Sequence, residues 1–373
     1  MSATSPRRGA IVTVYAVAVA IGATLLFLIQ PMFARVVLPP LGGAPAVWTT
    51  SVLFFQVVLL GAYLYAHALG RHGFTPTRAA IHLLLVAVGA LWLPLDIGWT
   101  RTLAAGSPPA WRLVVAATAA LGVPLFAVAA TAPLVQRWFT AIDPARADQA
   151  YALYAASNAG SLGGLLAYPL IVERIFTLNM QSRLWQVGYF ALTASLLAAA
   201  GLAYRYRPLT VRPDTIESDG SPDAPSWPLT LSWLVRAGAA AALMQSVTLY
   251  LTTDIAASPL LWVLPLSAYL LTFVLAFAPR LKLPIRLVTA MVPVAGLVAA
   301  LALLTTLIRP TWVLLAVHLV CVFVLALGCH VAIAGTRPPA RHLTAFYLWL
   351  ALGGALGSAF TVLLAPHLFT YAV

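Results

Sequence analysis

The stretch from Tyr151 to Glu173, YALYAASNAGSLGGLLAYPLIVE, decides the fold class of this chain. It carries no charge before its last residue, and a helix needs roughly 20 such residues to cross about 30 Å of hydrocarbon. Only 8% of the 373 residues are charged and 62% are hydrophobic, whereas a soluble domain has about 25% charged residues. The composition therefore excludes a water-soluble globule.

Similar apolar stretches recur along the whole chain, and we expect about 11 transmembrane helices. The expected spans are 10–34, 48–66, 79–95, 113–136, 149–172, 184–204, 231–252, 260–278, 287–308, 310–335 and 343–366. The sequence thus predicts an all-α polytopic membrane protein. The first span follows Arg7 and Arg8 as a signal peptide would, but it is too long for one, and we interpret it as a retained helix.

The basic residues predict the orientation of these spans. With the N-terminus in the cytoplasm, 15 of the 21 Lys and Arg residues lie on the cytoplasmic side, as the positive-inside rule requires. We therefore expect a multi-pass protein of the bacterial inner membrane. The basic residues form no stripe interleaved with aromatic residues, so the charge of +12 gives no indication of a nucleic-acid partner.

The chain divides into two membrane halves. We expect an N-terminal six-helix half at 1–204, a polar cytoplasmic linker at 205–230 and a C-terminal half of about five helices at 231–373. The segment from Gln30 to Trp48 matches that from Gln245 to Trp262, and Gly160-Ser-Leu-Gly163 matches Gly354-Ala-Leu-Gly357. Two such repeats predict a major-facilitator-like plan, in which a twelfth helix would follow the last expected span.

Four blocks of sequence resemble the membrane part of the bacterial fused major-facilitator/spermidine-synthase-like family. They are FLIQPMFARVVLPPLGGAPAVWTTSVLFFQ (Phe27 to Gln56), the opening stretch, YLTTDIAASPLLWVLPLSAYLLTFVLAF (Tyr250 to Phe277) and RHLTAFYLWLALGGALGSAF (Arg341 to Phe360). In that family the membrane part is followed by a last helix and a cytoplasmic synthase-like domain. This sequence ends before both, so the resemblance implies a membrane architecture and not the synthase activity.

Polar residues of the opening stretch fall on one helix face. Tyr151, Tyr154, Asn158 and Ser161 recur at spacings of three or four residues, and an Asn in hydrocarbon must find a hydrogen-bond partner. The stripe either holds helices together or lines a cavity. Rows of small residues, Gly160 with Gly164 and Gly353 with Gly357, indicate close helix packing.

Other polar residues near the spans are candidates for a ligand cavity. With Tyr154 and Asn158 above, the set comprises Gln30, Arg35, Gln56, Gln245 and Asp254. Arg35 either reaches the membrane interface or presents its charge to an anionic ligand, and Asp254 either caps its helix or forms an ion pair with Arg35. The second alternative is the sharper hypothesis, because equivalent segments of the two halves face each other in such folds.

The sequence offers no catalytic grouping, no cofactor motif and no metal cluster. His318 and His330 lie about 12 residues apart and do not share a helix face as two ligands would. We expect a binding or transport protein that moves a small solute through a cavity between the halves. The alternative is a membrane anchor or regulatory module for a spermidine-synthase-like domain or partner.

The small number of acidic residues near the expected cavity indicates the charge of the solute. A polycation such as a polyamine would need several buried carboxylates to offset its lost hydration, and only Asp254 and Glu173 lie near a cavity in this interpretation. A neutral or anionic solute fits better. No Asp or Glu lies in the middle of a span, so coupling to protons would require a histidine.

Overall fold

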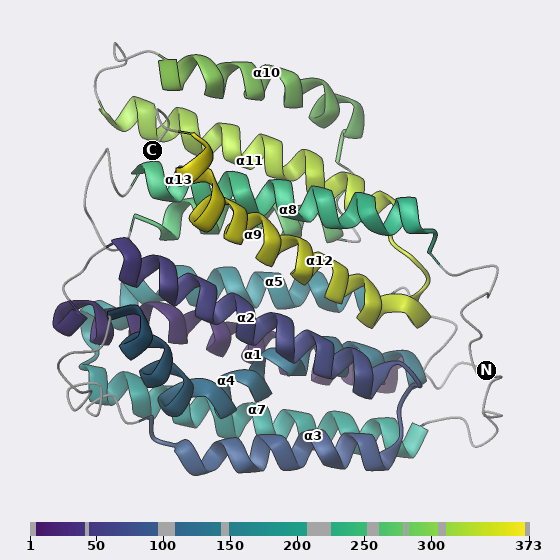
Figure 1. The fold of residues 1–373 in the computed structure, drawn as a ribbon. Helices are drawn as coiled ribbons and strands as arrows, with labels where there is room; N and C mark the ends of the chain where they lie inside the picture. Colours follow the sequence, from purple (N-terminus) through teal and green to yellow (C-terminus); the bar gives the residue numbers. More distant parts are fainter. Residues whose placement is uncertain are drawn as a thin grey trace. The chain divides into compact units, whose positions relative to one another are not determined.

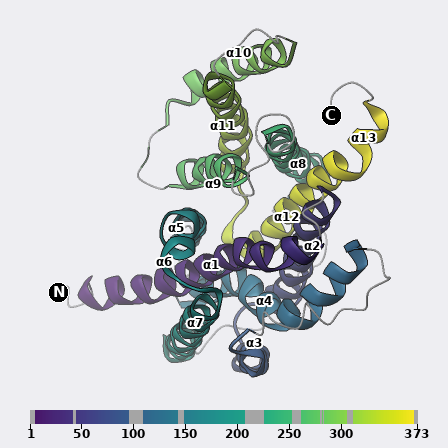
Figure 2. The same cartoon turned by 90° about the vertical axis from the view of Figure 1, so that its left-hand side faces the viewer.

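Every regular element in the described part of the chain is a helix. The computed structural model describes residues 5–41, 45–95, 109–142, 149–206, 225–251, 261–278, 281, 283–304 and 311–369. Each expected span overlaps an α-helix, which confirms the all-α membrane fold (Figures 1 and 2). Eight helices are long and apolar enough to cross a membrane, and the apolar helices at Pro76–Trp92 and Val263–Phe277 are shorter.

The helices alternate with short turns along the described segments. Their bounds are α1 (Ser5–Leu41), α2 (Pro45–Gly70), α3 (Pro76–Gly89), α4 (Pro109–Ile142), α5 (Gln149–Ala167), α6 (Glu173–Ile175), α7 (Leu178–Tyr206), α8 (Trp227–Tyr250), α9 (Val263–Phe277), α10 (Ile285–Leu304), α11 (Thr311–Gly335), α12 (Leu343–Ala359) and α13 (Ala365–Leu368). Two π-helical turns, Tyr168–Val172 and Phe360–Leu364, follow α5 and α12.

The chain forms two compact units. Unit 1 comprises Met1–Trp227 with Pro338–Leu348, and unit 2 comprises Pro228–Arg337 with Trp349–Val373. Unit 1 therefore contains α1 to α7 and the beginning of α12. Unit 2 contains α8 to α11, the rest of α12 and α13.

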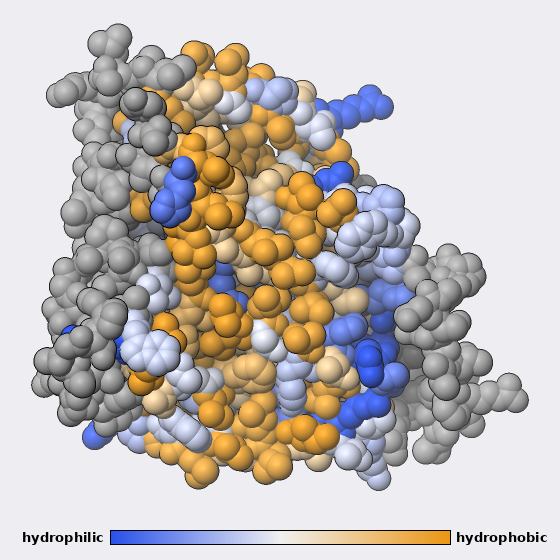
Figure 3. All heavy atoms as spheres, viewed as in Figure 1, coloured by the Kyte–Doolittle hydropathy of each residue, from blue (hydrophilic) through white to orange (hydrophobic). Residues whose placement is uncertain are grey.

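The helices expose apolar side chains where a soluble protein would expose charged ones. Val57 and Leu64 on α2 are 68% and 56% exposed, and Leu297 on α10 is 62% exposed. Apolar side chains cover most of the described surface in Figure 3, and hydrophilic ones gather mainly near helix ends at the right of the view. Such a surface is stable against lipid chains, because it has no polar group to desolvate.

Glycine residues let one pair of helices in each unit pack with backbones in contact. In unit 1, a Cβ added at Gly160 would lie 2.6 Å from the Ala20 oxygen, and one at Gly164 would lie 2.8 Å from the Thr24 oxygen, so α5 runs parallel to α1. In unit 2, Gly353 and Gly357 meet the backbone of α8 in the same way. Both expected packing rows are therefore confirmed.

These contacts shift our alignment of the repeats by one residue. A Cβ at Gly163 or at Gly354 would meet nothing within 4 Å. Gly160 and Gly164 consequently correspond to Gly353 and Gly357, and the match of Gly163 with Gly357 was wrong. The sequence pattern favoured the wrong pairing because both segments contain an extra glycine that faces away from the partner helix.

Candidate functional site

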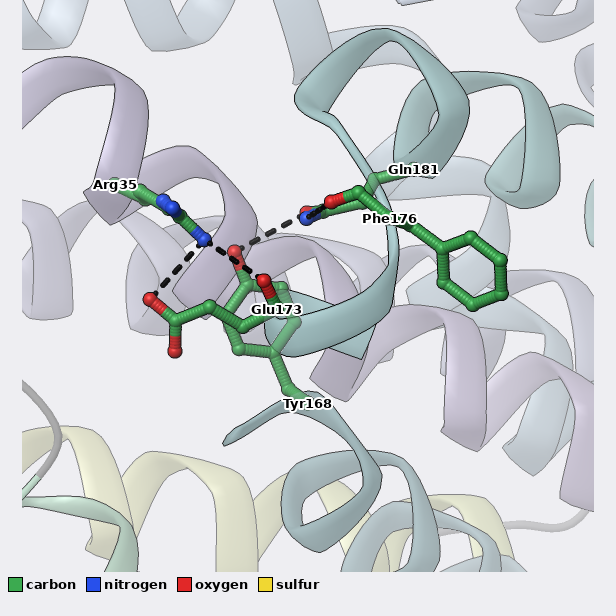
Figure 4. A network of polar contacts seen from close by, with 5 residues as sticks. All are labelled: Arg35, Tyr168, Glu173, Phe176 and Gln181. Atoms are coloured by element: carbon green, nitrogen blue, oxygen red, sulfur yellow. Dashed lines mark hydrogen bonds and ion pairs between the residues drawn. The ribbon is translucent and has the colours of Figure 1, made fainter. Parts of the chain in front are cut away.

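A polar cluster joins the end of α1 to the end of α5 in unit 1 (Figure 4). Arg35 Nη1 lies 3.1 Å from Glu173 Oε1 and donates a longer hydrogen bond of 3.4 Å to the Glu173 carbonyl oxygen. The side chains remain partly exposed, at 44% for Arg35 and 25% for Glu173. This ion pair joins α1 to the segment after α5, beyond the point where Gly160 and Gly164 contact α1.

The π-helical turn Tyr168–Val172 explains how Glu173 reaches Arg35. An α-helix advances about 100° per residue, whereas the wider π turn inserts close to one extra residue. In regular α-helical register Glu173 would project away from the stripe that carries Gly160 and Gly164. The π turn rotates it back towards α1, where it meets Arg35.

Two further polar side chains lie beside this ion pair. The buried Tyr168 hydroxyl donates to Gln181 Oε1 at 3.2 Å, and Gln181 Nε2 donates to the Phe176 carbonyl oxygen at 2.9 Å. Gln181 belongs to α7, so the cluster ties the π turn to the start of that helix. Neither Tyr168 nor Gln181 was among the expected site residues, since neither stands out in an apolar pattern.

Arg35 therefore has a partner that the sequence did not indicate. An ion pair of Arg35 with Asp254 was one of two alternatives; in the structure Arg35 pairs with Glu173, and Asp254 lies outside the described residues. Glu173 is far from Arg35 in sequence, and only the parallel packing of α1 and α5 brings the two together. Glu173 is also the one carboxylate side chain among the described residues.

Three polar residues of the stripe on α5 make contacts within unit 1. Tyr151 is 2% exposed, and its hydroxyl donates to the Pro338 carbonyl oxygen. Tyr154 is half-buried and stacks on Tyr347, with ring centroids 4.6 Å apart. Asn158 is buried, and its Nδ2 donates to the Tyr154 carbonyl oxygen at 2.9 Å.

Tyr151 and Tyr154 thus belong to a larger contact surface within unit 1. We call residues Pro338–Leu348, which end with the first turns of α12, the docking segment. Its side chains Leu343, Thr344, Phe346 and Tyr347 are at most 2% exposed. They are buried because the segment packs on the ends of α2, α4 and α5.

Directional hydrogen bonds hold the docking segment in this position. The Tyr347 hydroxyl donates to Gln136 Oε1 of α4 at 2.7 Å. Thr344 Oγ1 lies 3.1 Å from His67 Nδ1 of α2. Each bond joins residues that are distant in sequence, and none of Gln136, Tyr347, His67 or Thr344 was among the expected site residues. The corrected alignment is the signal that would have identified Tyr347, because it makes Tyr347 the counterpart of Tyr154.

The expected cavity residues are divided between the two units. Gln30 and Gln56 are half-buried on α1 and α2 of unit 1, where Gln56 makes a polar contact. Gln245 is 4% exposed on α8 of unit 2. The assignment of these residues to a cavity remains a prediction.

Three of the described histidines are buried within helices away from the chain's turns. His82 and His330 are both fully buried, on α3 of unit 1 and α11 of unit 2. His318 is buried on α11, with its Nδ1 2.8 Å from the Leu314 carbonyl oxygen. Among the described residues, no three His, Cys, Asp or Glu side chains gather as metal ligands would.

Comparison with known proteins supports the fold and leaves the family open. No family model matches the chain, and no curated protein matches it either. A bacterial homologue of the iron transporter ferroportin, in its outward-facing state, is similar over 97% of this chain and 94% of its own, with 15% identity and a TM-score of 0.59. The POT family transporter PepTSo is similar over 98% of this chain and 90% of its own, with 12% identity and a TM-score of 0.57. The chain is a multi-pass membrane protein with a major-facilitator-like fold.

Proposed function

We propose that this protein moves a small solute across the membrane. The observation that carries the proposal is the docking segment, which packs on α2, α4 and α5 through side-chain hydrogen bonds and ring contacts. Its hydrogen bonds, Tyr347 to Gln136 and His67 to Thr344, join side chains and leave the backbone of each helix intact. The fold is also that of proteins whose names describe transporters.

The docking segment acts as a gate in this proposal. Under the orientation that the basic residues favour, with the N-terminus in the cytoplasm, the ends of α2 and α4 and the start of α5 lie on the cytoplasmic side. The segment then closes a path to the cytoplasm, and its release opens that path. The protein belongs in the bacterial inner membrane in this interpretation.

The solute is neutral or anionic. Candidate contacts are Tyr154, Asn158 and Gln30 of unit 1 and Gln245 of unit 2. Glu173 is already engaged with Arg35, so the described residues contain no carboxylate left to receive a cation. A polyamine would have to give up its hydration without compensation at such a site.

The test is a thermal-shift screen of the purified protein against anionic metabolites, polyamines and thioethers related to S-adenosylmethionine. Binding to the folded state raises the unfolding temperature, and we expect stabilisation by a neutral or anionic compound. The response should disappear in Asn158→Ala, which loses the buried amide, and persist in the control Ser195→Ala on the exposed part of α7. Stabilisation by polyamines alone would contradict the proposed solute class.

The same screen separates transport from the alternative role. Sequence resemblance to the fused family suggests an anchor or regulatory module for a spermidine-synthase-like partner. Such a module needs no solute in its membrane part. We expect a compound that stabilises the protein also to be taken up by proteoliposomes that contain it, and binding without uptake would favour the regulatory role.

A further inference from the structure

Unit 2 has few groups that can carry a proton through the membrane. Its one acidic residue, Asp254, lies outside the described residues. Side chains that change charge near neutral pH are histidines, and in the described membrane-spanning part of unit 2 these are His318 and His330. Buried ionisable residues in a membrane are costly and are commonly functional. Both histidines have a buried Nε2 without a hydrogen-bond partner among the described residues, but the ring nearest His318, that of Tyr250, lies 4.9 Å away and is tilted by 33°.

Hydrogen bonds determine which ring nitrogen of His330 bears its proton. His330 Nδ1 lies 2.7 Å from the Thr272 hydroxyl oxygen, on the neighbouring helix α9. That hydroxyl has one proton, which it donates to the Tyr269 carbonyl oxygen at 2.6 Å. With the Thr272 proton placed on that carbonyl, the Thr272 oxygen accepts from Nδ1–H, and this neutral tautomer presents a lone pair at Nε2.

This Nε2 atom is buried and has no hydrogen-bond partner among the described residues. His330 is fully buried. An unsatisfied polar atom of this kind lowers stability, and an apolar residue of similar shape would avoid that loss. The position therefore holds a basic nitrogen at a measurable cost to stability.

Aromatic rings surround the imidazole. It stacks on Phe273, with centroids 3.6 Å apart and planes inclined by 23°. Tyr269 lies 5.0 Å away in a T-shaped arrangement. The face of an aromatic ring attracts a cation, so Phe273 can stabilise an imidazolium where no carboxylate is at hand.

The other described groups around His330 are few. Tyr269 of α9 and Cys329 of α11 are the titratable neighbours. Arg236 of α8 interacts electrostatically with Cys329. On the side of α10, Val288 packs with Leu327 and Val331 of α11, and the one charged residue of α10, Arg286, is exposed. A proton on His330 would thus be held mainly by aromatic rings.

We propose that His330 is the proton-binding site that couples solute movement to a proton gradient. The inference rests on the proposed transport function. The Nε2 lone pair accepts a proton from water on one side of the membrane, which yields an imidazolium protonated at both nitrogens, and releases it to water on the other side. Because a buried charge is costly, the protonated ring favours a state in which α9 and α11 separate enough for water to reach Nε2.

His82 provides a matched comparison in unit 1. It is also fully buried, and its Nε2 lies 3.3 Å from the hydroxyl of Thr131, which donates to the Ala127 carbonyl oxygen at 2.9 Å. Its nearest described rings, Tyr65 and Trp138, lie 6.0 and 6.1 Å away. Without a stacked ring face, His82 lacks the feature that would hold a proton at His330.

The experiment is solid-state NMR of protein labelled with [15N]histidine in lipid bilayers, recorded from about pH 8.5 to about pH 5. The chain has seven histidines, so the His330 signals are identified as those missing from His330→Asn. We expect the bare ring-nitrogen signal of this set to disappear as the pH falls, with the appearance of an imidazolium signal. Both should be absent in His330→Asn, whose amide can replace Nδ1–H towards Thr272 but has no basic nitrogen. Both should remain in the control His82→Gln.

Two outcomes would overturn the proposal. In the first, a bare nitrogen of His330 persists at every pH. In the second, the imidazolium signal is unchanged in His330→Asn. If that variant does not fold, Thr272→Val serves instead, since it removes the oxygen that fixes the tautomer and should add signals of the second tautomer. No solute is present, so failure of the transport proposal would appear separately, in the uptake assay.

Discussion

The ion pair of Arg35 and Glu173 contributes little to the stability of unit 1. Their ion pair joins α1 to the π turn after α5, but both side chains are partly exposed. Water and salt screen such a pair, and exposed pairs contribute about 0.2–1 kcal/mol. The pair therefore fixes the rotation of Glu173 towards α1 more than it stabilises unit 1.

We predict a small loss of stability in Glu173→Gln. The unfolding free energy should fall by less than about 1 kcal/mol, because the amide keeps the shape and loses only the charge. Unfolding of the single variants and of the double variant with Arg35→Gln would give the coupling energy of the pair. A coupling energy of zero would mean that the pair contributes nothing to stability, and one well above 1 kcal/mol would mean that it is far less screened than its exposure indicates.

The glycine contacts belong to the scale of helices. α1 with α5 and α8 with α12 are equivalent pairs, and each is followed by a π turn in the second helix. The two π turns have unlike sequences, Tyr-Pro-Leu-Ile-Val and Phe-Thr-Val-Leu-Leu. The repeat is thus better preserved in backbone geometry than in residue identity.

Alanine should distinguish the glycines that pack from those that do not. In Gly357→Ala the new methyl group would overlap the backbone of Gly238, and overpacking of this kind typically costs about 1–3 kcal/mol. Gly354→Ala is the matched control, since its methyl group would meet open space. Thermal unfolding in detergent should show a lower midpoint for Gly357→Ala and little change for the control. Equal midpoints would show that α8 and α12 are not packed at this register.

The docking segment is the second feature at this scale. Tyr347→Phe removes the hydroxyl that donates to Gln136 and retains the ring that stacks on Tyr154. We expect a loss of roughly 1 kcal/mol, because the buried Gln136 oxygen loses its donor. Amide hydrogen exchange in Pro338–Leu348 should become faster.

The control for this variant is Tyr206→Phe, which changes an exposed ring at the end of α7. It should leave exchange in the docking segment at the wild-type rate. Unchanged exchange in Tyr347→Phe as well would show that the hydroxyl does not hold the segment in place.

At the scale of the whole molecule, the charge distribution predicts orientation. Basic residues outnumber acidic ones by 21 to 9, and 15 of the basic residues fall on one side of the expected spans. Juxtamembrane Lys and Arg remain on the cytoplasmic side during insertion. The N-terminus and the 205–230 linker should therefore both lie in the cytoplasm.

Labelling of a single cysteine would check this orientation. A membrane-impermeant thiol reagent should not modify Ser221→Cys in intact cells and should modify it after permeabilisation. Wild-type protein is the control for Cys321 and Cys329, which lie within α11. Labelling of Ser221→Cys in intact cells would place the linker outside and reverse the predicted topology.

The sequence by itself determined the membrane class and the approximate positions of the helices, and it indicated the repeat without its register. Apolar stretches long enough to cross a bilayer are a local property, because in hydrocarbon each helix must satisfy its own backbone hydrogen bonds. The glycine rows were also predictable, since small residues four apart lie on one helix face.

Only the tertiary structure decided which side chains meet. The partner of Arg35 is Glu173 because α1 and α5 run parallel and a π turn rotates Glu173 towards α1. The docking segment contacts α2, α4 and α5 through residues far from them in sequence. A helical pattern indicates the face on which a residue lies, but packing alone sets the rotation, the register and the neighbour that the face meets.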